Sequence, residues 1–385
     1  MRSLGWNPNK AENDVWIKDC KTHYEYLAVY VDDILVASKD PKQIMDELQK
    51  TYIVRGIEMP DYFLGAEYGR IKGDYSDRGV TSTWSAKTYL VNVIEKVERI
   101  FGELRTFTCP MDPDYHPELD ETDFIETVEI SKYRMLTGSA QWAITLGRVD
   151  IIYATSMLSR YNNAPREGHV LAMKKLFGYL KGHQKGKLIF DTSKLDTSNA
   201  KLFDCSEWKQ IYGDNLVEDL PADMPKPKMK PVDITIYFDA SFGSDMLTRR
   251  SVTGIVVFLN STPVKWFCKK QNTVETSTYG SELVAGRLAC EMAIAFRYKL
   301  RMLGIPMNTP TLLLGDNMSM IQNCSISSSQ LKKKHNAIAY HKIRECVAAG
   351  VILLAHVSSE ENIADICTKA LNGPKLHGLM KSLSH

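Results

Sequence analysis

The residues best placed to do chemistry are four carboxylates in the C-terminal third of the chain: Asp239, Glu282, Asp316 and Asp365. Carboxylates brought close together repel one another unless divalent cations lie between them. Ligand sets made only of oxygen select Mg²⁺ or Mn²⁺ over zinc. Paired metal ions about 3.5–4 Å apart are the usual apparatus for cutting a phosphodiester. The four acids therefore predict a metal-dependent phosphodiester-cutting site, provided that the fold gathers them.

Taken alone, each acid has a plainer explanation. Asp239 follows the β-branched and aromatic run 234–238, which predicts a buried strand. Residues 240–243 are predicted to form the turn after that strand. A carboxylate in this position is usually a turn or cap residue, so Asp239 by itself indicates catalysis only weakly. The other three acids are what strengthen the catalytic interpretation.

The elements that must position these acids alternate between strand and helix. Glu282 lies at the start of a segment with the apolar spacing of an amphipathic helix. Asp316 closes the predicted strand 312–315, and Asp365 lies near the start of a helix that follows the predicted strand 351–357. An α/β domain gathers side chains in such positions at one edge of its sheet. The alternation therefore predicts a shared site.

Five stretches of this region carry distinctive patterns: 237–245 (YFDASFGSD), 249–254 (RRSVTG), 266–271 (WFCKKQ), 315–319 (GDNMS) and 364–369 (ADICTK). Together, and in this order, they resemble the ribonuclease H domain of copia-type retrotransposon Pol polyproteins. The match extends from residue 232 to about residue 371. The resemblance implies an α/β, ribonuclease H-like fold with a mixed sheet and flanking helices.

The resemblance also implies roles for the acids. In that family, the residues matching Asp239, Glu282, Asp316 and Asp365 are catalytic and hold two metal ions, so Mg²⁺ or Mn²⁺ is the implied cofactor and no small-molecule cofactor is implied. The implied reaction is hydrolysis of the RNA strand of an RNA–DNA hybrid. The chain departs from the family just before Glu282, where residues 277–282 are STYGSE in place of SSTEAE.

Basic residues interleaved with aromatic ones are the candidate contacts with nucleic acid, because a cationic track with rings suits a phosphate backbone. The candidates are Arg249, Arg250, Lys265, Lys269, Lys270 and His341. Related nucleases often carry a histidine between the third and fourth acids that assists product release, and by position His341 or His335 matches it. An ordinary surface histidine is the alternative explanation for both.

A second acidic pair, Asp32 and Asp33, lies between two apolar runs of residues 24–38. This layout predicts a β-hairpin with acids at its tip, and aspartate is common in turns for structural reasons alone. The sequence Tyr30-Val-Asp-Asp33, however, resembles the palm hairpin of reverse transcriptases. In that family both acids lie at the polymerase site, which implies that Asp32 and Asp33 bind metal and face a template–primer in the parent element.

Only 31 residues precede Asp32, too few for the rest of a polymerase palm and its fingers. We therefore expect a fragment of a larger element, or a gene model begun at an internal methionine, with no polymerase activity of its own. Three interpretations stay open: a ribonuclease H fragment, an inactive relic or module that binds hybrids without cutting, and a parent polyprotein as the working unit.

Composition and motifs divide the chain into five predicted parts. They are a truncated α+β palm remnant (1–70), a thumb-like segment and linker (71–125), a helical connection (126–195), a polar linker rich in proline and lysine (196–231) and the ribonuclease H domain (232–385). The polar linker is expected to be an extended, solvated tether. In the helical connection, four residues are candidates for contact with nucleic acid: Arg160, Lys174, Lys175 and Lys181.

Bulk composition sets further limits. The chain of 385 residues is 44% apolar and 24% charged, as in ordinary globular proteins, and its net charge of +2 means that any basic surface must be local. Its eight cysteines form no Cys-x-x-Cys pair, so free thiols in a reducing compartment are expected. No membrane span or signal peptide is predicted. The resemblance implies a cytoplasmic virus-like particle, and the nucleus, as the location.

Overall fold

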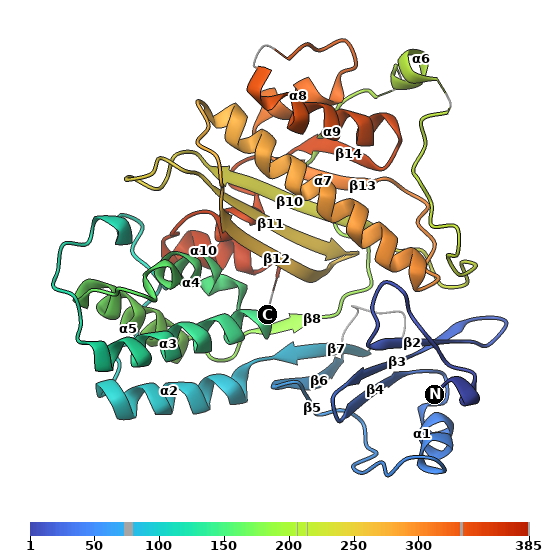
Figure 1. Ribbon diagram of the computed structural model, residues 1–385, viewed down its shortest axis with the longest axis horizontal. Coiled ribbons are helices and arrows are strands. Elements are labelled where there is room, and N and C mark those ends of the chain that lie inside the picture. The colour runs from blue at the N-terminus through green and yellow to red at the C-terminus, as the bar shows by residue number, and fades with distance from the viewer. Residues whose placement is uncertain (73–79, 206, 214, 332–333, 384–385) are drawn as a thin grey trace.

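A mixed sheet of six strands forms the centre of the molecule, and two smaller antiparallel sheets accompany it (Figure 1). The computed structural model describes residues 1–72, 80–205, 207–213, 215–331 and 334–383. The α/β class with a mixed sheet and flanking helices, predicted from the sequence, is confirmed.

The central sheet has the strand order β12-β11-β10-β13-β14-β9. Its strands are β9 (Lys201–Leu202), β10 (Ile234–Ser241), β11 (Val252–Leu259), β12 (Thr262–Lys270), β13 (Thr311–Gly315) and β14 (Ile352–His356). The strands β10, β11 and β12 form an antiparallel meander, whereas β13 and β14 run parallel to β10. Parallel neighbours need crossover connections, and the helices between these strands supply them.

Helices cover the central sheet on both faces, which explains why every residue of β10 is buried. On one face, Ile236 and Phe238 of β10 share a hydrophobic core with three helices. These are α7 (Thr278–Met302), α8 (Met318–Ser325) and α9 (Ala337–Ala348). On the other face, Tyr237 belongs to a second core, built with elements from the preceding half of the chain and with α10 (Gly373–Met380). Residues of β10 thus alternate between two cores.

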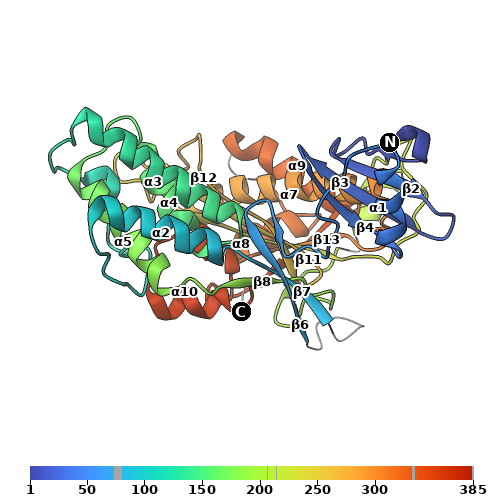
Figure 2. The same ribbon diagram turned by 90° about the horizontal axis from the view of Figure 1, so that it is seen from below.

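The second core joins parts of the chain that the sequence divides into separate units. It combines residues of α2 (Lys87–Phe101), α3 (Thr127–Thr145), α4 (Ile152–Leu158) and α5 (Glu167–Gly182) with residues of the central sheet. These helices lie against the sheet of β5 (Tyr62–Phe63), β6 (Ala66–Lys72), β7 (Val80–Ser85) and β8 (Lys187–Ile189) (Figures 1 and 2). Because one core serves both regions, the C-terminal sheet is packed as part of the whole chain.

The N-terminal sheet has its own small core of Trp6, Leu27, Ile44 and Leu48. It consists of β1 (Asn7–Pro8), β2 (Val15–Asp19), β3 (Tyr24–Tyr30) and β4 (Asp33–Ala37), followed by α1 (Pro41–Gln49). It is tied to the C-terminal end of α7, where Asn9 Nδ2 donates to the Met302 carbonyl oxygen at 2.6 Å. Tyr26 Oη donates to the Leu303 carbonyl oxygen at 2.5 Å.

The polar segment 196–231 packs against the central sheet and is not the free tether predicted from its composition. Its strand β9 pairs with the edge strand β14. Trp208 is buried, and its Nε1 donates to the Ser325 carbonyl oxygen at 2.7 Å. Glu218 forms ion pairs with Arg297 and Arg301 of α7. A few anchoring side chains fix a stretch whose average composition favours solvation.

The remaining helices are short: η1 (Arg2–Leu4), η2 (Pro117–Leu119), η3 (Val149–Ile151), η4 (Ser159–Tyr161), α6 (Trp208–Tyr212), η5 (Lys334–Asn336) and η6 (Ile363–Cys367). Of these, η6 matters most for the site, because it carries Asp365. Within the described residues, no helix combines the length and apolar character needed to cross a membrane.

Candidate metal centre

Asp239 lies inside the central strand β10, where it pairs with Gly254 of β11. The prediction that the strand ends before Asp239 is wrong by a short distance, because Ala240 and Ser241 continue the antiparallel ladder. The side chain is 2% exposed. Its position in a paired strand fixes its backbone far more firmly than a turn would.

Glu282 reaches Asp239 from the first turns of α7, as the helical spacing predicted. The helix is capped by Ser277, whose side chain accepts a hydrogen bond from the Gly280 amide at 3.3 Å. Glu282 is 5% exposed, and its Oε1 accepts a hydrogen bond from the Ala240 amide at 3.2 Å. Its Oε2 is buried with no hydrogen-bond partner among the described residues. One carboxylate oxygen therefore remains available for a ligand.

Asp316 follows β13 directly, as predicted, and the helix α8 begins two residues later, at Met318. Asn317 caps α8 by accepting a hydrogen bond from the Met320 amide at 3.0 Å. Because β13 runs parallel to β10, with Leu314 beside Tyr237, the end of β13 arrives next to Asp239. Oxygen atoms of Asp239, Glu282 and Asp316 lie within 4.8 Å of one another. The structure thus brings three of the four predicted acids together.

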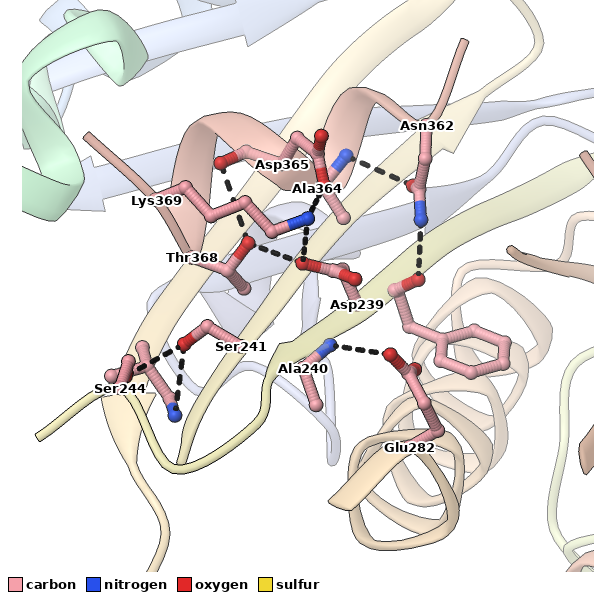
Figure 3. Close-up of polar contacts among 12 residues, drawn as sticks. Asp239, Ala240, Ser241, Ser244, Glu282, Asn362, Ala364, Asp365, Thr368 and Lys369 are labelled. Atoms are coloured by element: carbon pink, nitrogen blue, oxygen red, sulfur yellow. Dashed lines mark hydrogen bonds and ion pairs between the residues drawn. The ribbon is translucent and has the colours of Figure 1, made fainter. Parts of the chain in front are cut away.

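Asp365, the fourth acid, is held apart from this group by lysine side chains. Lys369 Nζ lies 2.7 Å from Asp365 Oδ1 and 3.5 Å from Asp239 Oδ2, so its ammonium group stands between the two carboxylates (Figure 3). Lys375 Nζ lies 3.1 Å from Asp365 Oδ2. Thr368 Oγ1 also donates to Asp239 Oδ2. The position between Asp239 and Asp365 is therefore filled by a cation from the chain itself.

Burial and mutual repulsion set the charge state of the acidic group. Burial, with Asp365 and Asp316 nearby, raises the pKa of Asp239 to about 6, although Lys369 and Thr368 oppose the rise. Burial, and then the charges of Asp239 and Asp316, raise the pKa of Glu282 well above its ordinary value. Three carboxylates in this arrangement are poorly compensated by the chain, which favours a bound divalent cation.

The donor set fits a hard divalent cation. All three ligating groups are carboxylates, which suit Mg²⁺ or Mn²⁺, and Glu282 Oε2 lacks a partner of its own. Asp239, Glu282 and Asp316 are the residues that would hold such an ion. A second ion between Asp239 and Asp365 would have to displace the Lys369 ammonium group.

The segment of η6 is locked onto the sheet by residues that sequence reasoning did not single out. Asn362 is fully buried; its Nδ2 donates to the Phe238 carbonyl oxygen at 3.0 Å, and its Oδ1 accepts from the Ala364 amide at 3.2 Å. Gly254 explains the close approach, since a Cβ there would lie 2.6 Å from Thr368 Cγ2 and 2.8 Å from the Ala364 carbonyl oxygen. These contacts hold Asp365 and Lys369 beside Asp239.

Two further residues near the acids were also missed. Lys369 belongs to the stretch ADICTK that carries the resemblance. The only sequence signal for its ion pair with Asp365 is the spacing of four residues in a segment predicted to be helical. His356, at the end of β14, donates from Nε2 to the Asp316 carbonyl oxygen at 3.1 Å. No local sequence signal marks this histidine, because the contact crosses between neighbouring strands.

The basic residues predicted to contact nucleic acid differ in exposure and in their contacts. Arg249, Lys265, Lys269 and His341 are exposed, and Arg250 is half-buried. Lys270 is engaged, since its Nζ lies 2.9 Å from the buried carboxylate of Asp245. Within the described parts of the chain, none of the six forms a hydrogen bond or ion pair with the four acids. Their role in binding nucleic acid stays a prediction.

Asp32 and Asp33 occupy the tip of the hairpin between β3 and β4, and the predicted hairpin is confirmed. Tyr30 pairs with Asp33, which leaves Val31 and Asp32 as the two turn residues. Both aspartates are exposed, and among the described residues neither belongs to a group of potential metal ligands. The structure does not bring this pair to the other acids.

Comparison with known proteins finds retrovirus-related Pol polyproteins that are similar to this chain over most of its length. It is 28% identical over 376 residues to the retrovirus-related Pol polyprotein from transposon RE1 of Arabidopsis thaliana, covering 97% of this chain and 22% of that protein. The predicted resemblance to copia-type retrotransposon Pol polyproteins is confirmed. The Pol polyprotein from transposon TNT 1-94 of Nicotiana tabacum is 24% identical over 361 residues, covering 91% of this chain and 24% of that protein.

The chain spans about a fifth of the length of these Pol polyproteins. No family model matches it. Among solved structures, the N-terminal RNase H domain of a Mycobacterium tuberculosis protein aligns with 39% of this chain and 98% of its own, at 14% identity and a TM-score of 0.28. LC11-RNase H1 aligns with 35% of this chain and 94% of its own, at 17% identity and a TM-score of 0.29.

Proposed function

We propose that this chain is a reverse transcriptase and ribonuclease H fragment of a retrotransposon, and that its acidic site cuts the RNA strand of RNA–DNA hybrids with Mg²⁺ as the cofactor. The observation that carries the proposal is the convergence of Asp239, Glu282 and Asp316 within 4.8 Å, in a chain homologous to Pol polyproteins. Buried carboxylates with raised pKa values are typical of catalytic sites.

Divalent metal at this site would activate a water and stabilise the leaving 3′ oxygen. Asp239, Glu282 and Asp316 would hold it, and the Ala240 amide keeps Glu282 turned toward Asp239 through its hydrogen bond. Asn362 and Gly254 keep the η6 segment, and with it Asp365, against β10 and β11. Lys369 neutralises part of the charge between Asp239 and Asp365.

Selectivity for RNA would come from the 2′-hydroxyl group and the shape of the hybrid, since only the RNA strand carries that hydroxyl. The exposed basic residues Arg249, Lys265 and Lys269 would contribute contacts with phosphates, so hybrid binding should weaken as salt rises. Polymerisation on a template–primer, with Asp32 and Asp33 as metal ligands, is proposed for the longer Pol protein. Its location in cytoplasmic particles and the nucleus is proposed on the same basis.

A module that binds hybrids without cutting them is the second candidate. The observation that favours it is the Lys369 ammonium group, which fills the position between Asp239 and Asp365 that a second metal ion would need. Two-metal hydrolysis requires both positions to be held by metal. A site that keeps Lys369 in place would bind one cation and a duplex without cutting the RNA strand.

The test uses the full chain, because the C-terminal sheet shares its core with the helices before it. An end-labelled RNA–DNA hybrid is incubated with the protein, with and without Mg²⁺, beside the variants Asp239→Asn and Asp33→Asn. Mg²⁺-dependent cutting of the RNA strand by the wild type and Asp33→Asn, but not by Asp239→Asn, is the expected result. Equal cutting by Asp239→Asn would overturn the proposal, and binding without cutting would favour the second candidate.

A further inference from the structure

A cavity of about 520 Å³ lies outside the carboxylate site and is lined by residues from the C-terminal ends of α3 and α5, from β8 and from α10. The loop that joins α5 to β8 forms part of its rim. None of the four acids of the candidate metal centre lines it. It is a separate feature of the region that joins the helices to the C-terminal sheet.

The inner wall of this cavity contains a buried arginine that is only partly satisfied. Arg148 is 5% exposed; its Nε donates to Asp150 Oδ1 at 3.0 Å and its Nη2 donates to Asp150 Oδ2 at 2.6 Å. Tyr179 Oη donates to the same carboxylate at 2.8 Å. Arg148 Nη1 is buried and has no hydrogen-bond partner among the described residues. A buried guanidinium nitrogen left unpaired is costly, so a ligand oxygen beside it would be stabilised.

The charges around the cavity favour an anion. Asp150 is the only carboxylate among the lining residues, and it already accepts hydrogen bonds from Arg148 and Tyr179. On the rim, Lys185 and Lys187 are exposed and form no ion pair within the described parts of the chain. Their ammonium groups are available for a ligand.

The lysines that sequence reasoning favoured in this region are already engaged. Lys181 Nζ lies 2.8 Å from Glu98 Oε1, and Lys175 is paired with Asp112. Lys174 lies over the Phe101 ring. Lys185 and Lys187, which sequence reasoning passed over, therefore add positive charge at the cavity that no ion pair among the described residues neutralises.

Rings complete one side of the cavity. His183 stacks on Tyr179 with ring centroids 4.4 Å apart, and His377 of α10 lies 5.0 Å from His183. His183 Nδ1 donates to the Tyr179 carbonyl oxygen at 2.9 Å, which fixes the ring. His377 Nε2 is a second buried atom without a hydrogen-bond partner in the described structure. Two of the residues that line the cavity, Arg148 and His377, therefore each carry a buried polar atom without a hydrogen-bond partner in the described structure.

We propose that this cavity binds a backbone phosphate of a nucleic-acid strand. A guanidinium group is the preferred donor for phosphate oxygens, and lysines at an open mouth suit a strand that passes across it. The proposed function is the basis for assigning this strand to the hybrid that is cut at the acidic site. Phosphate binding in the cavity does not depend on the proposed function. The cavity is thus a second anchoring point for a duplex.

Gly186 offers a test that changes only one charge. It lines the cavity, and a Cβ added to it would meet no atom within 4 Å, so both Gly186→Asp and Gly186→Asn should fold. Binding of a fluorescently labelled RNA–DNA hybrid to the full chain is measured by anisotropy in EDTA at several NaCl concentrations. The Asp variant should bind on the order of tenfold more weakly than the Asn variant. Equal binding by the two variants would overturn the proposal.

A pair of double variants checks the salt dependence. Lys185→Gln with Lys187→Gln should lower the slope of log K against log salt by about one for each lysine that contacts a phosphate. The matched control is Lys209→Gln with Lys226→Gln, which removes two exposed lysines that do not line the cavity. An unchanged slope in the first pair, or the same loss in both pairs, would contradict a phosphate contact at the cavity.

Competition distinguishes the possible sources of the phosphate. AMP carries a phosphate monoester, and an excess of AMP should leave hybrid binding unchanged. Full displacement of the hybrid by AMP would mean that the cavity binds a mononucleotide, which would overturn the proposal of a strand phosphate. Because EDTA removes divalent metal, these measurements report binding without cutting. A failure of the nuclease proposal, seen as uncut hybrid with Mg²⁺, therefore stays distinct from a failure of the cavity proposal.

Discussion

Two groups of acidic residues in this chain differ in burial and in the residues that surround them. Asp32 and Asp33 are exposed at the tip of the β3–β4 hairpin, whereas Asp239 and Glu282 are almost fully buried beside Asp316. Local strand pairing alone fixes the positions of Asp32 and Asp33, because Tyr30 and Asp33 pair across a two-residue turn. The buried group needs β10, α7 and β13 together. The comparison teaches that a carboxylate acquires distinctive chemistry from its neighbours in space.

The surroundings also differ in charge compensation. At the buried group, the Lys369 ammonium, the Thr368 hydroxyl and the Ala240 amide all contact the acids. No described residue makes such a contact with the side chain of Asp32 or Asp33. Substitutions that change buried, charge-compensated acids or their partners should therefore have very different consequences from substitutions in the exposed hairpin pair. Three predictions test this, from the largest expected effect to the smallest.

Glu282→Gln should reduce Mg²⁺-dependent cutting of an RNA–DNA hybrid by at least about a hundredfold, since it removes a charge from the proposed ion site. The amide oxygen of glutamine can still accept the hydrogen bond from Ala240, so the fold should persist. Single-turnover rates at saturating protein measure the effect, and circular dichroism checks the fold. The matched variant Asp33→Asn should cut within about twofold of the wild type. An equal loss of cutting rate in both variants would contradict the proposed difference between the two acidic groups.

Lys369→Gln should create room for a second divalent ion between Asp239 and Asp365, because it removes the ammonium group that separates them. Affinity at that position should rise on the order of tenfold. Mn²⁺ binding followed by electron paramagnetic resonance counts the ions: one tightly bound ion is expected in the wild type and two in the variant. Lys369→Arg keeps the charge and should stay at one. The same count in all three proteins would contradict the cation-filling role of Lys369.

Asp245→Asn should destabilise the chain by about 1–2 kcal/mol near neutral pH, an effect absent from Asp33→Asn. Burial alone would raise the pKa of Asp245, but the Thr248 amide and the Lys270 ammonium group lower it to about 2. Because the folded pKa lies below the unfolded one, the stabilisation is complete above the unfolded pKa of about 3.9 and is lost as the pH falls toward 2.

Urea unfolding midpoints of the wild type and Asp245→Asn, measured at pH 7 and at pH 3, check this dependence. The difference between the two proteins should shrink at the lower pH. A constant difference would mean that Asp245 stabilises the loop by packing, and that its ion pairs with Lys270 and Arg160 contribute little.

Much of the fold could be predicted because element type depends on local periodicity. The helix of Glu282, the strand before Asp316 and the hairpin of Asp32 and Asp33 all appear as expected. The strand end at Asp239 was misplaced because Ser241 and Gly243 are residue types common in turns, whereas pairing with β11 keeps Ala240 and Ser241 extended. The segment 196–231 was misjudged for a related reason: a few long-range anchors outweigh its average composition.

The sequence by itself determined the candidate acids, the alternation of strands and helices that carries them, and the relationship to Pol polyproteins, because motifs and periodicity are properties of the local chain. Only the tertiary structure decided that Lys369 separates Asp365 from Asp239, that Lys270 and Arg160 hold Asp245, and that Arg148 lines a cavity together with Lys185 and Lys187. These are contacts between residues distant in sequence. Their geometry depends on how helices and strands pack, which residue spacing does not encode.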